Sequence, residues 1–248
     1  MTTLQDTIRP QAKTSDWKAI VVLILLIPVL WSPVILFRYV LFQPFNIPSS
    51  SMTPTLVVGD YVFAAKYAYG YGRYSVPFAP SFISGRFRAA DPAYGDVVVF
   101  TTPKDTTVDY IKRVVGLPGD RIQMREGQLV INDIPVARVA LKDVAAGAAC
   151  GGEVSAKVKR WRETLPNGVS YITYDCIDNG FLDNTQVYTV PPGHFFALGD
   201  NRDNSTDSRM MSAIGFVPMD NLVGKVTRIF WSVDSRGELR AERLGKVG

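Results

Sequence analysis

The chain has 248 residues, enough for one large domain or two modest ones, and 47% of them are hydrophobic. Charged residues make up 20%, which excludes a disordered chain or a coiled coil. Basic and acidic residues number 27 and 23, and this net charge of +4 gives no case for a nucleic-acid partner. The two cysteines and the single histidine, His194, have no metal-ligand spacing, so we expect no metal.

Residues 19–37 form the longest apolar run, AIVVLILLIPVLWSPVILF, and contain no charge. At ~1.5 Å per residue the run is about 28 Å long, close to the ~30 Å hydrocarbon core of a bilayer. A buried core helix is rarely apolar on every face, and a cleavable signal peptide has a shorter apolar region before a small-x-small site. The sequence therefore predicts a transmembrane helix. Pro28 and Pro33 would kink it, and waters or a serine side chain such as that of Ser32 can take up the carbonyls that the prolines free.

Basic residues are unequally divided between the two ends of this run. Arg9, Lys13 and Lys18 precede it, whereas only Arg38 lies within the next twenty residues. The positive-inside rule then predicts that residues 1–18 are cytoplasmic and that the chain crosses the membrane once. In a bacterium this places the remainder outside the inner (cytoplasmic) membrane, in the periplasm or on the outer face.

After residue 43 the sequence shows no helical periodicity of any length, so we expect a mainly β protein. Short runs rich in Val, Ile, Tyr and Phe alternate with turn signals, and Asn132-Asp133 between LVI and IPV predicts a tight hairpin. The expected strands lie within residues 60–70, 95–100, 109–116, 127–136, 193–199 and 221–231.

Residues 137–190 differ in composition from their surroundings and are interpreted as a small subdomain inserted into a β core. The core itself comprises residues 38–136 and 191–248. Both cysteines fall in the insert. In an oxidising compartment we expect Cys150 and Cys176 to form a disulfide, worth ~3–4 kcal/mol in the chain-entropy model, with two free buried thiols as the alternative.

Three serines stand in a row just after the apolar run, in PSSSMTPTL at residues 48–56. The surrounding prolines hold this stretch extended and exclude a helix. By itself the cluster is weak evidence for a nucleophile, because serine is common in loops and the cluster has neither a G-x-S-x-G elbow nor S-x-x-K spacing.

A lysine and an arginine, Lys112 and Arg113, stand next to each other in the apolar run DYIKRVVG. Because side chains alternate across a strand, one of the two must point towards the more buried side. Such a lysine usually extends its ammonium group to solvent. If it is desolvated instead, its pKa falls and it becomes a workable base for a neighbouring serine, which an arginine could not be.

The polar segment GDNRDNSTDSR, residues 199–209, lies between two strand-like runs. It lacks the central Gly and terminal Glu of an EF-hand calcium loop. Its Asp, Asn and Ser side chains can form side chain-to-backbone turns that hold a rigid loop, and Asp207 with Arg209 can form a bidentate ion pair.

Taken together and in order, these segments resemble the bacterial type I signal peptidases (leader peptidases), which are membrane-anchored serine proteases with a Ser–Lys dyad. The resemblance rests on PSSSMTPTL at 48–56, GDYVF at 59–63, GDVVVF and DYIKRVVGLPGD within 95–120, GDNRDNSTDSR at 199–209 and GFVPMDNLVGKV at 215–226. It implies an antiparallel β core of the signal-peptidase type, with one N-terminal transmembrane helix and no cofactor.

By motif position, the resemblance implies that Ser51 is the nucleophile and Lys112 the general base. Ser49 and the N–H of Ser51 would form the oxyanion hole, and Ser205 would orient the lysine amine. Asp207 and Arg209 would brace the loop. The family commonly has Gly where Ser50 stands, a position at which a positive φ would disfavour serine. We interpret His194 as structural.

The resemblance also implies shallow pockets for the small side chains of an Ala-x-Ala cleavage site. Their walls would be Phe45, Ile47, Met52, Leu56, Tyr110 and Ile111. The expected partners are the signal peptides of preproteins and the lipid bilayer, with a monomer as the functional unit. Two alternatives stay open: a relative dedicated to a narrow substrate such as a pilin or a conjugation protein, and an inactive tethered β domain that binds peptides.

Overall fold

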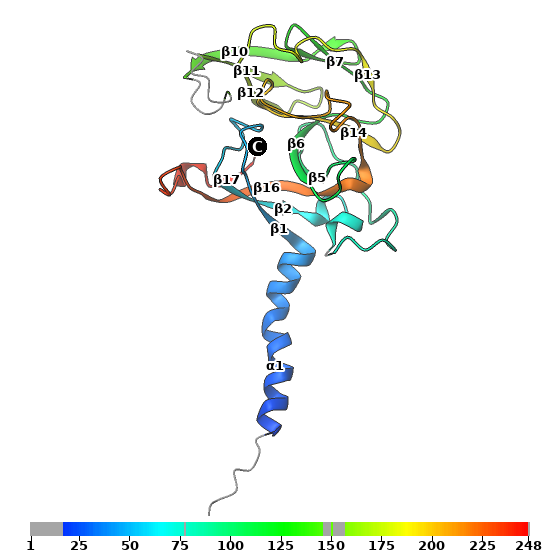
Figure 1. Ribbon diagram of the computed structural model, residues 1–248, viewed down its shortest axis with the longest axis vertical. Coiled ribbons are helices and arrows are strands. Elements are labelled where there is room, and N and C mark those ends of the chain that lie inside the picture. Colours follow the sequence, from blue (N-terminus) through cyan, green and yellow to red (C-terminus); the bar gives the residue numbers. More distant parts are fainter. Residues whose placement is uncertain (1–16, 77, 146–149, 151–156, 248) are drawn as a thin grey trace, which may run out of the picture.

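The structure is a computed structural model that describes residues 17–76, 78–145, 150 and 157–247. Its first element is helix α1 (Trp17–Leu36), which continues as a π-helical turn (Phe37–Leu41) and extends away from the rest of the molecule (Figure 1). Among the described residues, one segment is long and apolar enough to cross a membrane, Ile20–Leu41. Its mean hydropathy is 2.9, and none of its most apolar stretch is buried inside the protein. The expected helix therefore exists and runs four residues further than Phe37. The basic residues Arg9 and Lys13 lie outside the described residues.

Helix α1 contains Pro28 and Pro33, and Ser32 bonds the carbonyl that Pro33 frees. Pro33 has no N–H to donate to the carbonyl of Val29, four residues earlier. The hydroxyl of Ser32 donates to that oxygen instead, at 2.8 Å. This satisfies one of the carbonyls that the prolines free inside the helix.

An eight-stranded antiparallel sheet carries the helix. Aromatic rings connect the helix to the sheet. The ring centroid of Phe37, in the π-helical turn, lies 5.6 Å from that of Phe63, and the Phe63 ring stacks on Phe230 with their centroids 4.1 Å apart. In spatial order the strands are β1 (Phe42–Asn46), β2 (Asp60–Ala65), β16 (Leu222–Ser232), β5 (Val97–Thr101), β6 (Asp109–Gly116), β14 (His194–Leu198) and β15 (Val217–Pro218), with β17 (Gly245–Lys246) paired to β16. Strand β1 is thus an edge strand.

A second layer of strands lies on the side of this sheet away from helix α1 (Figure 1). It contains a four-stranded sheet of β13 (Tyr188–Thr189), β7 (Arg121–Arg125), β8 (Gln128–Ile131) and β9 (Ile134–Pro135), and a three-stranded sheet of β10 (Ala137–Val144), β11 (Val158–Thr164) and β12 (Ser170–Asp175). The hairpin at Asn132-Asp133 is confirmed, and both residues have the positive φ, 54° and 66°, of a type I′ turn.

One hydrophobic cluster contains residues from both the expected core, which ends at residue 136, and the insert that begins at residue 137. Ile122 and Leu129 pack in the same core as Leu165 and Tyr171 of the insert, together with Phe196 of the main sheet. The inserted strands therefore share a core with the hairpin that precedes them in the chain. After Leu41 the described helical segments are short 3-10 turns of three residues each, at Lys66–Ala68, Arg73–Ser75, Met219–Asn221 and Ala241–Arg243. Two further short strands, β3 (Tyr71–Gly72) and β4 (Arg86–Phe87), pair with each other.

Candidate active site

A cavity of about 820 Å³ opens between the end of β1, the start of β6 and the loops that follow β12 and β14. Strand β1 contributes a free edge, and β6 pairs with β14 only from Arg113 onward, so residues 109–112 lack a strand neighbour on that side among the described residues. The expected site residues that line the cavity are Phe45, Ile47, Ser49, Ser51, Met52, Tyr110, Ile111, Lys112 and Ser205. The exception among the pocket residues is Leu56, which is fully buried in the core below; the expectation that it forms a pocket wall is wrong.

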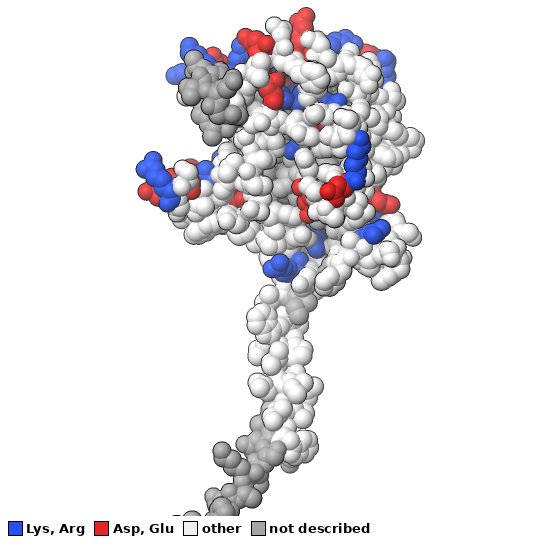
Figure 2. Space-filling view, in the orientation of Figure 1, with Lys and Arg blue, Asp and Glu red and all other residues white. Residues whose placement is uncertain are grey.

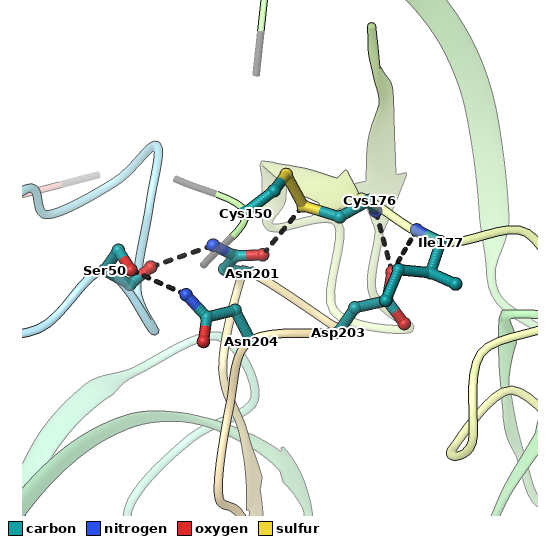
Figure 3. The surroundings of a disulfide bond; sticks show 7 residues. All are labelled: Ser50, Cys150, Cys176, Ile177, Asn201, Asp203 and Asn204. Atoms are coloured by element: carbon teal, nitrogen blue, oxygen red, sulfur yellow. Dashed lines mark hydrogen bonds between the residues drawn. A yellow bond between two sulfur atoms is a disulfide. The ribbon is translucent and has the colours of Figure 1, made fainter. Parts of the chain in front are cut away.

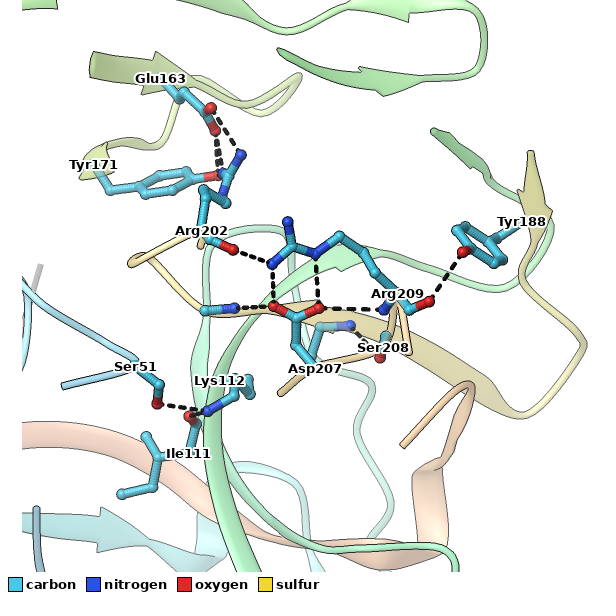
Figure 4. A network of polar contacts seen from close by, with 12 residues as sticks. Ser51, Ile111, Lys112, Glu163, Tyr171, Tyr188, Arg202, Asp207, Ser208 and Arg209 are labelled. Atoms are coloured by element: carbon cyan, nitrogen blue, oxygen red, sulfur yellow. Dashed lines mark hydrogen bonds and ion pairs between the residues drawn. The ribbon is translucent and has the colours of Figure 1, made fainter. Parts of the chain in front are cut away.

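Ser51 and Lys112 meet in this cavity although they are far apart in the sequence. The Lys112 Nζ lies 2.8 Å from the Ser51 Oγ and 3.0 Å from the carbonyl oxygen of Ile111, to which it donates (Figure 4). Ser51 is half-buried in the turn after β1, whereas Lys112 is 3% exposed on β6. An amine held this close to a hydroxyl can take its proton when the amine is neutral.

The environment of Lys112 favours the neutral amine. Burial lowers the pKa of Lys112 to about 8, against the opposing charges of Asp207 and Asp200. An ammonium loses water when it is buried, and this penalises the charged form. With a pKa near 8, about a tenth of the molecules carry a neutral lysine at pH 7, compared with ~0.04% for an unperturbed lysine.

Both Lys112 and Arg113 are buried. The sequence predicted only that one of the two would point towards the more buried side of the strand. The two side chains point to different faces of β6: Lys112 lines the cavity beside Ser51, and Arg113 packs on the Tyr171 ring of β12. The Arg113 guanidinium forms a bidentate ion pair with Asp200, with Nε and Nη2 2.8 and 2.7 Å from the carboxylate oxygens. Its remaining nitrogen donates to the Gly95 carbonyl, and the group lies 4.1 Å from the centroid of the Tyr171 ring.

The Asp200 carboxylate connects this ion pair to the serine turn. The Thr55 hydroxyl donates to Asp200 Oδ2 at 2.5 Å, and the backbone N–H of Asn201 donates to the carbonyl of Ser51 at 3.1 Å. The segment 199–209 is therefore a scaffold that positions the serine turn relative to β6. Asp200 and Arg113 act through other residues and are positioning residues.

Ser50 is held by the same scaffold (Figure 3). The side-chain amide of Asn204 donates to the Ser50 Oγ at 2.7 Å, and that of Asn201 donates to the Ser50 carbonyl at 3.1 Å. Ser50 is not among the residues with positive φ, so serine fits this position without the backbone strain that a glycine would relieve. Its hydroxyl is engaged away from Lys112, which leaves Ser51 as the serine in contact with the base.

Ser49 is exposed at the mouth of the cavity, and its Oγ lies 3.3 Å from the Ser51 Oγ. Among the described residues the Ser51 N–H forms no hydrogen bond. The Ser49 hydroxyl and this N–H are thus two donors near the Ser51 Oγ that are available to an oxygen of a bound substrate.

The hydrogen bond expected between Ser205 and Lys112 is not present, although both residues line the cavity. The buried Ser205 Oγ has no hydrogen-bond partner of normal geometry among the described residues, but its hydroxyl is one of the groups that lower the pKa of the Asp207 carboxyl. It packs instead against Gly199, where a Cβ atom would lie 2.2 Å from the Ser205 Oγ and 2.6 Å from the Ser51 carbonyl oxygen. Gly199 is therefore required by the close approach of the scaffold to the serine turn.

Two further buried ion pairs hold the scaffold itself (Figure 4). Arg209 donates to both oxygens of Asp207 at 2.8 Å, and the N–H of Gly199 donates to the same carboxylate. Burial alone would raise the pKa of Asp207, but the charge and hydrogen bonds of Arg209 lower it below its usual value. Arg202 forms a second bidentate pair with Glu163 of β11, at 3.0 and 2.5 Å, which ties the scaffold to the inserted strands.

The cysteines lie beside the scaffold as well (Figure 3). Cys150 and Cys176 are joined in a disulfide, and the carboxylate of Asp203 accepts hydrogen bonds from the N–H groups of Cys176 and Ile177 at 2.7 and 2.9 Å. Ile177, exposed, lines the cavity on the side opposite β1 together with Phe181. The insert thus contributes one wall of the cavity.

His194 lies at the start of β14, where its Nδ1 is 2.9 Å from the Pro192 carbonyl, and it does not line the cavity. Within the part of the chain that the structure describes, no group of three or more His, Cys, Asp and Glu side chains is placed to hold a metal ion.

Sequence reasoning missed the positioning residues of this site. Their signal was present in part: two consecutive cations in an apolar strand cannot both reach solvent, so one requires an acidic partner. The identity of that partner, Asp200, depends on the fold. The roles of Gly199 and of the Arg202–Glu163 pair have no local signature, because each depends on a segment distant in the chain.

Comparisons with known proteins identify the family of this chain. Residues 15–231 match the family model described as "Signal peptidase, peptidase S26". Relatives named signal peptidase I include that of Rickettsia typhi, 42% identical over 204 residues (79% of this chain and 74% of the relative), and that of Rickettsia prowazekii, 40% identical over 203 residues (79% and 74%). A crystal structure of a signal peptidase I from Enterococcus faecalis covers 56% of this chain and 98% of its own, with 26% identity and a TM-score of 0.32.

Proposed function

Because this chain belongs to the signal peptidase family, peptidase S26, and is therefore a serine peptidase that removes signal peptides, we propose that Ser51 is its nucleophile and Lys112 its general base. The observation that carries the proposal is the 2.8 Å approach of the buried Lys112 Nζ to the Ser51 Oγ in a cavity open to substrate.

In the proposed reaction the Ser51 oxygen attacks the scissile carbonyl carbon while Lys112 accepts its proton. The oxyanion that develops is stabilised by the Ser49 hydroxyl and the Ser51 N–H. The Lys112 ammonium then gives its proton to the departing amine, and the neutral lysine activates a water molecule that hydrolyses the acyl-enzyme. No step needs a cofactor.

We propose that the substrate binds in an extended conformation between β1 and the start of β6. Both have free edges at the cavity, so a peptide can add to them through main-chain hydrogen bonds. The proposed walls of the side-chain pockets are apolar and closely packed: Ile47 and Met52 are 5% and 2% exposed, and Ile111 is half-buried. Such walls favour small side chains and support cleavage after an Ala-x-Ala site.

The proposed location is the extracytoplasmic side of a bacterial inner membrane, with helix α1 crossing the bilayer once and residues 1–18 in the cytoplasm. We propose that the protein acts as a monomer on the signal peptides of preproteins. The 22-residue apolar segment Ile20–Leu41 supports the anchoring, because most of it lies in helix α1, which extends away from the β domain (Figure 1). Strand β1, which lines the site, follows the anchoring segment directly in the chain. This position suits a substrate that emerges from the bilayer.

The function is tested by incubating the full chain in detergent with a preprotein that carries an Ala-x-Ala site and mapping the cut by mass spectrometry. We expect one cut, after the second alanine. Matched substrates with leucine in place of either alanine should resist cleavage. Cleavage of the leucine substrates at the same rate would contradict the proposed pockets, and no cleavage of any member of a preprotein panel would contradict a general signal peptidase.

The pH dependence of kcat/KM should follow the titration of Lys112. The active form is the neutral amine, so with a pKa of about 8 the rate should rise about tenfold per pH unit from pH 6 and level off above pH 8. The measurement is kcat/KM for a peptide substrate between pH 6 and pH 10. A rate that still rises tenfold between pH 9 and pH 10 would show that the base has an ordinary lysine pKa.

Ser49→Ala should raise the barrier by ~2–4 kcal/mol, or about 30- to 1,000-fold in kcat, because it removes one oxyanion donor. Ser50→Ala is the matched control, since it removes a neighbouring hydroxyl that is engaged by Asn204 rather than directed at the reaction centre. We expect less than a tenfold loss there. Equal losses in the two variants would argue against the oxyanion role of Ser49.

A further inference from the structure

A second cavity, of about 350 Å³, lies where the π-helical turn after α1 meets the β domain. Its volume is within the range of small-molecule sites, ~300–1,000 Å³. Arg38 from the π-helical turn, Lys66 from the 3-10 turn after β2 and Thr101 from the end of β5 all line it. These residues have no part in the proposed peptidase reaction.

Lys66 is the unusual member of this cavity. The residue is only 3% exposed, yet among the described residues its ammonium forms no hydrogen bond and no ion pair. The positive charge of Arg38 acts on the Lys66 ammonium, and Arg38 also has no acidic partner among the described residues. Burial and the Arg38 charge both lower the pKa of Lys66. A cation on a largely buried side chain without a partner is costly, and an anion in the cavity between the two side chains would reduce that cost.

The cavity also contains a donor that lacks an acceptor among the described residues. The Thr101 Oγ1 is buried and has no hydrogen-bond partner there. Asp109 is the one carboxylate among the lining residues, and it also borders the catalytic cavity. It forms no ion pair with either basic residue. Two unpaired cations and an unused hydroxyl therefore converge on one space, which is the arrangement of an anion site.

The position of the cavity indicates which anion it meets. Arg38 is the first charged residue after the uncharged run 19–37, so it lies where a membrane helix leaves the hydrocarbon core. Basic side chains gather at this junction (Figure 2), and exposed aromatic residues lie beside it, among them Tyr39, Tyr67 and Phe78. Aromatic side chains are enriched at the level of lipid headgroups, where the phosphates also lie.

We propose that Arg38 and Lys66, with the Thr101 hydroxyl, bind the phosphate group of an anionic phospholipid at the extracytoplasmic surface. The lipid supplies the counter-charge for Lys66, and it fixes the height and rotation of the β domain over the bilayer. The site is distinct from the peptidase site; it rests on the membrane anchoring proposed above and not on the Ser51–Lys112 chemistry.

The test is native mass spectrometry of the full chain in a neutral detergent, titrated with phosphatidylglycerol or phosphatidylcholine. We expect phosphatidylglycerol to bind more tightly, and Lys66→Met and Arg38→Gln each to weaken it by about fivefold or more. Lys142→Met is the matched control, because it removes an exposed charge from β10, on the side away from α1, and should change nothing. Arg38 is exposed, so Arg38→Gln decides the matter if the buried variant fails to fold.

Equal binding of the two lipids by the wild type, or unchanged phosphatidylglycerol binding in Arg38→Gln and folded Lys66→Met, would overturn the proposal. Inorganic phosphate is the third arm. If millimolar phosphate displaces the lipid completely and its own binding depends on Lys66, the site serves free phosphate and the lipid assignment is wrong. Because the readout is binding, failure here is distinguishable from failure of the peptidase assignment.

Discussion

Lys112→Met is expected to lower kcat/KM by about 10⁴-fold or more while the protein remains folded. The substitution removes the base that lies 2.8 Å from the Ser51 Oγ, and the methionine fills the buried space with an apolar side chain of similar length. A buried lysine contributes little to stability because burial penalises its charge, so we expect no loss of folding. The measurement is cleavage of an Ala-x-Ala preprotein, with thermal unfolding as the check on folding.

Three variants sharpen this result. Lys112→Arg keeps a long, basic side chain but cannot give up its proton at neutral pH, so it should be as inactive as Lys112→Met. Lys112→His should also fail, because the shorter side chain does not reach Ser51. Ser51→Ala should abolish turnover, and combining it with Lys112→Met should cost little more, because the two residues act as a unit. Cleavage by Lys112→Arg or Ser51→Ala at near wild-type rates would rule out the dyad.

Asp200→Asn should destabilise the protein by ~3–5 kcal/mol, the typical cost of leaving a buried charge without its partner. Arg113 and Asp200 are both about 1% exposed, and the pair connects β6 to the segment that holds the serine turn. We expect activity to fall as well, since Thr55 loses its charged acceptor. The measurement is urea unfolding of the full chain in detergent micelles, followed by tryptophan fluorescence.

The chain offers a matched control for this substitution in the exposed Arg121–Asp133 pair, whose side chains are 51% and 53% exposed at a separation of 2.6 Å. Asp133→Asn removes the same charge from the same kind of pair and should cost at most about 1 kcal/mol. The double variant Arg113→Met/Asp200→Leu should recover much of the stability lost in Asp200→Asn. A loss in Asp200→Asn no larger than that in Asp133→Asn would contradict the proposed structural role of the buried pair.

The catalytic cavity and the scaffold differ in how far their residues could be predicted. Ser51 and Lys112 stand in distinctive motifs, so their resemblance to a known dyad is recognisable in the amino-acid sequence. Ser205, the expected partner of Lys112, lines the same cavity but forms no hydrogen bond with the amine; it packs on Gly199. Motif position predicts which segment lies nearby, but not which hydroxyl on that segment points at the amine.

Leu56 is a second residue whose position the motif did not predict. It lies in the same motif as Ser51, five residues further along, and the resemblance of that motif to the family implied a pocket role. The turn after Ser51 reverses the chain, however, so that Leu56 enters the hydrophobic cluster below the cavity with Met52 and Val62. Local sequence indicates that a residue is apolar, but it does not distinguish a pocket wall from the core behind it.

The sequence alone determined the features that depend on local physics. An uncharged run of membrane length, a hairpin at Asn132-Asp133 and a set of short apolar strands follow from hydropathy and backbone preferences. Only the tertiary structure decided what surrounds the lysine. Lys112 and Ser51 are 61 residues apart, and they meet because β1 and β6 belong to one sheet beneath the segment 199–209. The burial that lowers the Lys112 pKa comes from that packing, and desolvation depends on the whole surroundings of a side chain rather than on its neighbours in the sequence.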